Sequence, residues 1–395
     1  MKILRIIARL NVGGPARHVT LANAGLNARR HDTLLVFGTL DAGEASLENA
    51  AQEAGIRTIK LPSLGRRVSL FADLQALTEV TRLVFSEAPD VIHTHTAKAG
   101  TVGRLAAFLF NITRRRSRRC LVVHTYHGHV FEGYFGAVAS WAIRMVERSL
   151  ALITHRIVTI SPAQRHDIVE RFRVAPVGRT TTIALGLALE PLMALQPGAP
   201  DLRERFALGT NEVVVGFLGR MVPIKDLATL IQAFAIALER IPNMRLLLGG
   251  DGPERPFLVQ LAERLGIERR VVFPGWVDDL PRFYATLDIC ALSSINEGTP
   301  VAIIEAMAAA RPVAASAVGG VVDVVEQDVT GLLVPPRNPR ALANALMALS
   351  SAPDERRRMG EEGRRRATRY TQGRLVDDLE RLYQEGLAKV RSGGA

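Results

Sequence analysis

The sequence predicts two α/β domains of nearly equal size, each built on a parallel β-sheet covered by helices. At 395 residues the chain is too long for a single hydrophobic core. Short apolar runs alternate with longer amphipathic segments, which is typical of a parallel sheet wrapped by helices. The pattern loses its periodicity near residues 187–200, gains proline and glycine, and then starts again. We therefore expect one domain at residues 1–188 and another at 200–372.

In the first half, the expected strands are short and apolar. They are residues 2–7, 33–38, 90–95, 121–128 and 157–160, and the expected helices are residues 14–30 and 73–85. The N-terminal run resembles a signal peptide only briefly, because Arg5 and Arg9 interrupt it. We interpret it as the first strand.

The second half repeats the alternation. The expected strands are residues 212–220, 244–250, 270–275, 287–293, 313–318 and 331–336, and the expected helices are 227–241, 256–266, 301–310 and 373–390. In parallel α/β sheets, ligands bind at the carboxyl ends of the strands. The residues that follow each strand are therefore the candidates for function.

Composition places the chain among globular proteins, with 48% hydrophobic and 23% charged residues. Cys120 and Cys290 are the only cysteines, which predicts no disulfide framework and a reducing compartment. No uninterrupted apolar run approaches the roughly 20 residues that cross a bilayer. We expect a cytoplasmic protein, with peripheral attachment to the inner face of the cell membrane as a further possibility.

The net charge of +11 is confined to the first half of the chain. Residues 1–190 contain 25 Lys and Arg against 14 Asp and Glu, whereas the remaining residues contain 25 of each. Such asymmetry indicates that the first half meets an anionic surface or ligand.

Residues 105–119 read LAAFLFNITRRRSRR, an apolar segment that runs into five arginines. This composition is typical of an element that contacts an anionic membrane surface. A buried helix followed by a solvated loop explains it equally well. Nucleic-acid binding is not expected, because no interleaved aromatic residues or known binding motif accompany the arginines.

The stretch 294–313 contains two carboxylates, Glu297 and Glu305, eight positions apart. Thr299 is a candidate helix cap and Pro300 suits a first turn. Glu305 stands in an otherwise apolar helix, where an ionised carboxylate needs a partner. That partner is either a core arginine or a ligand hydroxyl close to the anion-favouring helix N-terminus.

Other strand ends of the first half carry glycine and histidine. Gly13 and Gly14 lie where a strand passes to a helix and would let backbone amides approach a ligand, although an ordinary tight turn also explains them. The pairs His93/His95 and His127/His129 are spaced as metal ligands could be in a strand. No carboxylate or cysteine accompanies them in a known ligand spacing, so we favour a ligand-contacting histidine, His127.

Strand ends of the second half carry cations and glycines. Arg220 follows Gly219, and Lys225 comes five positions after Arg220, which suits a diphosphate, although surface cations explain them too. Gly250 lies in the loop GGDGP after the next strand. That loop is neither a Walker A sequence nor a complete GxGxxG, so an NTPase and a dehydrogenase both lack their signature.

The order of these features resembles the GT4 family of retaining glycosyltransferases. The motifs are GRMVPIKD, GGDGPE, the stretch from FPGWVDD to AAARPV with its Glu-x7-Glu element, and VGGVVDVVEQDVTGLLVPP. The resemblance covers nearly the whole chain and is densest in residues 211–340. It implies the GT-B fold, in which two Rossmann-like doubly wound domains face a cleft. It also implies that the last helix, about 373–391, packs back on the N-terminal, acceptor-binding domain.

The resemblance further implies roles for individual residues of the nucleotide-sugar site. Arg220 and Lys225 would bind the diphosphate, Glu305 the ribose and Glu297 the transferred sugar. The backbone of Gly298, Thr299, Pro300 and Val301 would hold sugar and phosphate, with N–H donors from all but Pro300, and the loop around Trp276 and Val277 would contact the base. Gly13 and Gly14 match the family's glycine loop, and His127 matches a histidine near the reacting sugar. Ala310 and Thr299 depart from the family's usual residues, which leaves the donor sugar open.

These observations predict a hexosyltransferase that moves a sugar from a nucleotide diphosphate donor, such as a UDP-sugar, with anomeric retention. The acceptor would be a saccharide or a lipid-linked hydroxyl of cell-surface polysaccharide or glycolipid synthesis. No cofactor or metal is expected, and no Asp-x-Asp occurs in the chain. The alternatives are a nucleotide-sugar epimerase, a phosphorylase or a non-catalytic sugar-nucleotide-binding subunit.

Overall fold

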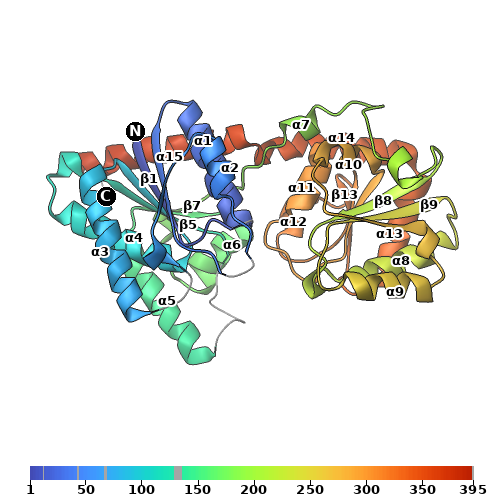
Figure 1. The fold of residues 1–395 in the computed structure, drawn as a ribbon, viewed down its shortest axis with the longest axis horizontal. Coiled ribbons are helices and arrows are strands. Elements are labelled where there is room, and N and C mark those ends of the chain that lie inside the picture. Colours follow the sequence, from blue (N-terminus) through green and yellow to red (C-terminus); the bar gives the residue numbers. More distant parts are fainter. Residues whose placement is uncertain (12, 42–43, 66–68, 129–135, 394–395) are drawn as a thin grey trace. The chain divides into compact units, whose positions relative to one another are not determined.

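The computed structural model describes residues 1–11, 13–41, 44–65, 69–128 and 136–393. The chain divides into two compact units, unit 1 (Met1–Leu187 with Gln372–Ala395) and unit 2 (Ala188–Thr371). Each unit is a parallel sheet with helices on both faces (Figure 1). The segment between the two expected domains belongs to unit 2, where α7 (Glu190–Met193) packs against α10 (Leu280–Thr286).

Unit 1 contains a seven-stranded sheet of order β3-β2-β1-β4-β5-β6-β7, and all of its strand pairs are parallel. The strands are β1 (Lys2–Ile7), β2 (Asp32–Phe37), β3 (Arg57–Lys60), β4 (Val91–His95), β5 (Leu121–Tyr126), β6 (Arg156–Thr159) and β7 (Thr180–Thr182). The helices are α1 (Gly14–Ala28), α2 (Glu48–Glu53), α3 (Leu70–Glu87), α4 (Ala97–Ile112), α5 (Ala137–Leu152), α6 (Pro162–His166) and α15 (Gln372–Ser392), with shorter turns η1 (Pro62–Leu64), η2 (Arg116–Arg118), η3 (Asp167–Arg171) and η4 (Val177–Arg179).

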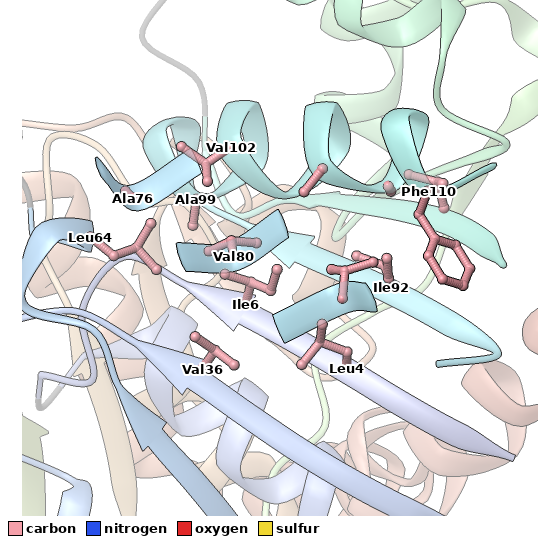
Figure 2. Packing of buried hydrophobic residues seen from close by; sticks show 14 of the residues in the cluster. Leu4, Ile6, Val36, Leu64, Ala76, Val80, Ile92, Ala99, Val102 and Phe110 are labelled. Carbon is pink, nitrogen blue, oxygen red and sulfur yellow. The ribbon is translucent and has the colours of Figure 1, made fainter. Parts of the chain in front are cut away.

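One face of the unit 1 sheet is covered by α3 and α4. Figure 2 shows Ala99 and Val102 of α4 above Ile6 and its neighbours on the strands. The close approach depends on small residues in α4. A Cβ at Gly103 would lie 2.5 Å from Cγ2 of Thr94 in β4, so a larger residue would push the helix away from the sheet.

The other face of the unit 1 sheet is covered by α1 and α15. Helix α15 comes from the far end of the sequence, yet its buried side chains recur every three or four residues and pack against β1, β4 and β5. The buried residues of α15 are Leu375, Val376, Leu379, Leu382, Tyr383, Gly386 and Leu387. The C-terminal segment is therefore part of the core of unit 1.

Unit 2 contains a six-stranded parallel sheet of order β10-β9-β8-β11-β12-β13. The strands are β8 (Val213–Leu218), β9 (Met244–Gly249), β10 (Val271–Gly275), β11 (Ile289–Leu292), β12 (Val313–Ser316) and β13 (Gly331–Val334). Besides α7 and α10, the helices are α8 (Leu227–Leu238), α9 (Arg255–Arg264), α11 (Val301–Ala308), α12 (Val321–Val324), α13 (Pro339–Ser351) and α14 (Pro353–Ala367), with turns η5 (Glu204–Phe206), η6 (Pro223–Lys225), η7 (Glu268–Arg270) and η8 (Thr368–Tyr370).

Several elements were not expected from the sequence, and two of them have a weak pattern. Strand β7 reads TTT and lies at the edge of its sheet, where few apolar side chains are needed. The charged stretch 353–367 is helix α14, whose buried residues are mainly small ones such as Gly360 and Gly363. Among the described residues, no helix combines the length and the apolar character needed to cross a membrane.

Shortening one buried side chain of α15 tests its place in the core. We expect Leu379→Ala, at a residue that is 1% exposed, to lower the free energy of unfolding of unit 1 by about 2–5 kcal/mol. The control Arg381→Ala on the exposed face of the same helix should change it by about 0.5 kcal/mol or less. Urea unfolding measures both, and equal effects would contradict a core position for α15.

Candidate active site

The strand order of unit 2 places a switch point between β8 and β11. The chain runs from β8 outward to β9 and β10, and then returns to place β11 on the other side of β8. The connections after β8 and β11 therefore diverge, and ligands of doubly wound sheets bind in the crevice that this leaves at the carboxyl ends. Lys225 follows β8 and Glu297 follows β11, so both lie at this point.

Lys225 and Glu297 form an ion pair with an Nζ to Oε1 distance of 2.6 Å. Ser294 donates a hydrogen bond to the same carboxylate oxygen at 2.6 Å. The pair is only partly covered, with 23% of the lysine and 10% of the glutamate side chain exposed. Among the described residues, Oε2 of Glu297 receives no hydrogen bond. One carboxylate oxygen is thus held by protein, and the other is available to a ligand.

Arg220 lies five residues before Lys225 in the sequence and is exposed. Its guanidinium makes no hydrogen bond or ion pair with any residue that the structure describes. Gly219 and Gly250 hold the adjoining loops together: a Cβ on Gly250 would lie 2.1 Å from the carbonyl oxygen of Gly219, and Gly250 has a φ of +111°. Only glycine fits here, because backbone packs directly on backbone.

The loop that carries Glu297 is fixed in a similar way by two glycines that the sequence analysis did not single out. A Cβ on Gly319 would lie 2.0 Å from the carbonyl oxygen of Glu297, and one on Gly320 would lie 1.8 Å from that of Gly298. The Gly320 amide also donates to the Glu297 carbonyl at 3.0 Å. Their only signal in the sequence is the Gly-Gly pair after an apolar strand.

The expected cap of α11 was wrong. The residue before the helix is Pro300, and α11 begins at Val301 without a side-chain cap. Oγ1 of Thr299 is buried and has no partner among the described residues. The amides of the first turn of α11 are therefore not capped by a side chain, which leaves them for an anionic ligand.

Glu305 lies inside α11 and is 9% exposed, as the apolar pattern around it predicted. The hydroxyl of Tyr284 in α10 donates to its Oε2 at 2.9 Å. Burial is the main cause, and the charge of the neighbouring Glu305 the second, that raises the pKa of Tyr284 well above its usual value. The phenol therefore keeps its proton and stays a donor. The sequence alone did not identify Tyr284 as this partner.

The other expected residues of unit 2 are placed at the same edge of the sheet. Trp276 and Val277 follow β10, and the Trp276 side chain is 70% exposed. An exposed indole of this size is a suitable stacking surface for a base. Trp276 is two strands away from the switch point in the sheet order, so it lies further out than Lys225 and Glu297.

Unit 1 has its own switch point, between β1 and β4. Gly13 and Gly14 follow β1 and open α1, which lacks a side-chain cap. A Cβ on Gly14 would meet no atom within 4 Å, so the protein itself leaves open space there. The glycines are therefore not needed for internal packing, and the space suits a ligand that approaches the helix N-terminus.

Four histidines gather at this switch point. Nε2 of His127 lies 2.9 Å from Nδ1 of His95, His95 stacks on His93 at 4.4 Å between ring centroids, and His18 of α1 packs edge-on to His127 at 5.0 Å. Nδ1 of His127 has no partner among the described residues. His129 lies outside the described residues. The structure thus brings His127 together with His93 and His95.

Burial keeps these histidines uncharged. It lowers the pKa of His127 to about 3, with the nearby Arg5 guanidinium as a second cause. Burial also lowers the pKa values of His18, His93 and His95 well below their usual range. Among the described residues, no group of three or more His, Cys, Asp or Glu side chains is placed to hold a metal ion.

Comparisons with known proteins agree with this architecture. Residues 13–186 match the family model "Glycosyl transferase 4-like domain", and residues 199–366 match "Glycosyl transferases group 1". A D-inositol 3-phosphate glycosyltransferase of Corynebacterium urealyticum is 30% identical over 75% of this chain and 71% of its own. The UDP-Gal:alpha-D-GlcNAc-diphosphoundecaprenol alpha-1,3-galactosyltransferase of Escherichia coli is 28% identical over 75% of each chain.

Among solved structures, Anabaena HepE in complex with UDP superposes with a TM-score of 0.80 at 23% identity, over 98% of this chain and 100% of that one. The chain therefore has the GT-B fold. It belongs to glycosyltransferase family 4 and is a glycosyltransferase.

The glycine loops of unit 2 allow a matched test. Gly250 and Gly266 both have positive φ, but a Cβ at Gly266 would meet nothing within 4 Å. We expect Gly250→Ala to lower the stability of unit 2 more than Gly266→Ala does, by roughly 2–4 kcal/mol against about 1 kcal/mol, because only the former clashes with backbone. Urea unfolding measures the difference. Equal losses would show that the contact with Gly219 is not rigid.

The buried histidines make stability depend on pH. The pKa of His155 is lowered to about 4 by burial and by Arg179, and its Nδ1 accepts the Val122 amide at 3.0 Å. Between about pH 6.5 and 4 the unfolded chain binds a proton at this position and the folded chain does not. The free energy of unfolding should therefore fall with falling pH by up to about 1.4 kcal/mol per pH unit per such histidine.

Urea unfolding at pH 7.5 and at pH 5 measures this slope. His155→Gln should reduce this slope by about the contribution of one histidine. Glutamine can accept a hydrogen bond from the Val122 amide but does not titrate. A slope that does not respond to His155→Gln would contradict a neutral His155.

Proposed function

We propose that the chain is a retaining glycosyltransferase that moves a hexosyl group from a nucleoside diphosphate sugar, a UDP-sugar in the simplest case, to a hydroxyl of a saccharide or lipid-linked acceptor. The observation that carries this proposal is the Lys225–Glu297–Ser294 group beside the uncapped start of α11. UDP is bound by HepE, and the Escherichia coli relative is named for a UDP-sugar donor and a diphosphoundecaprenol-linked acceptor. Both names support the choice of donor and acceptor.

In this proposal, unit 2 holds the donor. Lys225 and Arg220 contact the diphosphate, and the first-turn amides of α11 add donors with the positive end of the helix dipole. Tyr284 orients one oxygen of Glu305, and that carboxylate accepts from the ribose hydroxyls. The exposed Trp276 ring stacks on the base. Oε2 of Glu297 accepts from a hydroxyl of the transferred sugar.

Transfer breaks the bond between the anomeric carbon and the diphosphate oxygen, and negative charge develops on that leaving oxygen. Lys225, Arg220 and the α11 amides stabilise this charge where it forms, which is the largest contribution that a preorganised site makes to a rate. The acceptor oxygen bonds to the anomeric carbon on the face that the diphosphate leaves. Its proton passes to the departing phosphate oxygen, so the step needs no further base. With two cations in this position, we propose that no metal or other cofactor takes part.

His127 acts in this proposal as a neutral group. A pKa of about 3 means that it carries no charge at physiological pH, so it can hydrogen-bond the reacting sugar without adding charge to the site. Nδ1 of His95 contacts Nε2 of His127 and so holds the His127 ring. Nδ1 of His127 is left for the substrate. His127 is thereby a positioning group rather than a nucleophile.

We further propose that the acceptor belongs to cell-surface polysaccharide or glycolipid synthesis and that the enzyme works in the cytoplasm at the membrane surface. Support comes from the charge excess of the first half and from exposed apolar residues in the segment 105–119. Phe108, Leu109 and Ile112 of α4 are 41%, 40% and 58% exposed. Phe110 of the same segment is buried in the core, as the alternative of a buried helix expects.

Two substitutions test the donor site. Lys225→Ala should lower kcat by roughly 100- to 1000-fold, since it removes a charge that stabilises the leaving group. Glu305→Gln should raise the KM for the UDP-sugar by roughly 10- to 100-fold, since a charged hydrogen-bond acceptor is lost. UDP release in the presence of acceptor measures both effects.

Glu239 is exposed, directly follows α8 and offers a matched control. Glu239→Gln should leave kcat and the KM for the UDP-sugar unchanged. Proton NMR of the first product would give the anomeric configuration, and inversion would contradict the proposed mechanism. Wild-type turnover by Lys225→Ala would contradict the site. UDP release that does not depend on an acceptor would favour an epimerase or hydrolase.

A further inference from the structure

A cavity in unit 1 lies at the edge of the sheet opposite to His127. Its volume is about 1000 Å³, and its lining includes the first residues of β5 and β6, Leu121 and Arg156. The C-terminal end of α5, the chain after η3, and the last turns of α15 complete its walls. Amino-terminal strand ends are not where doubly wound sheets bind their principal ligands. This cavity is therefore separate from the candidate active site.

The cavity is strongly basic, and we call it the basic cavity. Seven cations line it: Arg116, Arg119, Arg148, Arg156, Arg173, Arg179 and Lys389. The described residues that line it include no Asp or Glu, and none of the seven forms an ion pair with a described residue. Other arginines of unit 1 are paired, for example Arg9 with Asp41 and Arg391 with Asp90. The missing negative charge at the basic cavity must come from a ligand or from solution.

Three of these cations donate to backbone carbonyls, and Arg156 donates to that of its neighbour His155 at 3.4 Å. Arg148 donates from Nε to the carbonyl of Arg173 at 3.0 Å and from Nη2 to that of Phe172 at 2.7 Å. Arg179 donates to the carbonyl of Leu152 at the end of α5 at 3.2 Å. These contacts orient the guanidinium groups without neutralising them. Fixed, unneutralised guanidinium groups match the geometry of phosphate oxygens.

The neighbouring His155 reports the electrostatic potential of the basic cavity. It lines the cavity, and its pKa is lowered to about 4 by burial first and then by Arg179, Arg156 and Arg119. Three separate cations therefore act on one lining group.

An apolar stripe on α5 runs into the basic cavity. Val138, Trp141, Met145 and Leu152 are 81%, 59%, 39% and 78% exposed, and their spacing of three, four and seven residues places them on one helix face. On the opposite face, Glu147 binds Arg104 of α4 through both carboxylate oxygens and fixes the helix to the unit. Helix α5 lies on the outside of unit 1 (Figure 1). Leu152 belongs to both the stripe and the lining of the cavity.

We propose that the basic cavity and the α5 stripe together form a docking site for an anionic membrane surface, with lipid phosphate groups in the cavity and the stripe among the acyl chains. This combination of cations and exposed aromatic and aliphatic side chains is that of an interfacial element. A single-stranded nucleic acid would need aromatic stacking surfaces beside the cations, and among the described residues of the lining His155 is the only ring of this kind. A soluble polyanion would use the cavity but not the stripe.

This inference deepens the membrane role in the proposed function and rests on it, but it assigns that role to different residues. Only Arg116 and Arg119 of the segment 105–119 line the basic cavity. The remaining five cations come from three other parts of the chain. The two assignments therefore predict that different variants lose membrane binding.

The test is co-sedimentation of the full chain with vesicles of phosphatidylglycerol and phosphatidylcholine, against vesicles of phosphatidylcholine alone. The variant Arg119→Gln/Arg173→Asn/Lys389→Gln removes three cations whose side chains make no hydrogen bond with any described residue. Asparagine is chosen at Arg173 because its φ is +49°. Each cation near an anionic surface contributes roughly fivefold to binding, so the affinity for anionic vesicles should fall roughly 100-fold.

Two further variants serve as controls. Arg30→Asn/Arg82→Gln/Arg240→Gln removes the same charge from exposed positions outside the cavity, again with one residue at positive φ, and should bind like wild type within about threefold. Arg115→Gln/Arg118→Gln tests the exposed arginines of the segment 105–119 that do not line the cavity. It should also retain most of its binding.

Trp141 supplies a readout for the stripe. The chain contains two tryptophans, and the other is Trp276. In a Trp276→Phe background, emission should shift to the blue on addition of anionic vesicles, and brominated lipid should quench it. Trp141→Phe/Leu152→Ser should weaken vesicle binding without weakening the binding of soluble polyphosphate to the cavity.

Each remaining outcome overturns the inference. These are wild-type protein that does not bind anionic vesicles, equal losses in the cavity variant and the control, loss confined to Arg115→Gln/Arg118→Gln, and polyphosphate binding without vesicle binding. Thermal stabilisation by UDP, measured on the same proteins, separates this result from the proposed reaction. Normal UDP binding without vesicle binding would contradict the docking site but not the donor site.

Discussion

A buried positive charge in the middle of the unit 1 sheet constrains much of that unit. Arg5 of β1 is fully buried, and its Nη2 donates to the hydroxyl of Tyr383 in α15 at 2.7 Å. The same hydroxyl lies 2.6 Å from Nδ1 of His93. Because no carboxylate among the described residues pairs with Arg5, a charged histidine beside it would be costly. The guanidinium thus joins the C-terminal helix to the sheet and helps to keep the histidines up to His127 neutral.

Unit 2 positions its site by different means. There the reactive side chains lie on loops that pack backbone against backbone, at Gly250 on Gly219 and at Gly319 on Glu297. Such contacts leave no room for a side chain and hold the two loops at a short backbone-to-backbone distance. The result is a lysine and a glutamate held 2.6 Å apart, although they are 72 residues apart in sequence. In the proposed reaction, a diphosphate would meet side chains on loops that are already held in place.

The sequence predicted the features that depend on local pattern. Alternating apolar segments located most strands, and the apolar surroundings of Glu305 predicted its burial. Its partner Tyr284 could not be predicted, because it comes from another helix. Thr299 was assigned as a cap from residue type, whereas the helix begins one residue later than that assignment requires. The charge excess was located in the first half as a whole, and membrane contact through residues 105–119 was one of two explanations of that segment. Clustered arginines are visible in sequence, whereas a cavity assembled from four segments is not.

The two edges of the unit 1 sheet differ in how charge is handled, and this difference bears on where an anionic surface can dock. At the carboxyl edge, burial and Arg5 hold His127 neutral, so that edge offers a hydrogen-bonding group without a net charge of its own. At the amino edge, cations such as Arg156 and Arg173 lack carboxylate partners among the described residues. Lipid phosphates attracted to the amino edge would not compete with a nucleotide sugar's diphosphate, whose cations Arg220 and Lys225 belong to unit 2. Under the two proposals, separate placement of the anion-binding regions would let one chain hold a membrane and a donor at once.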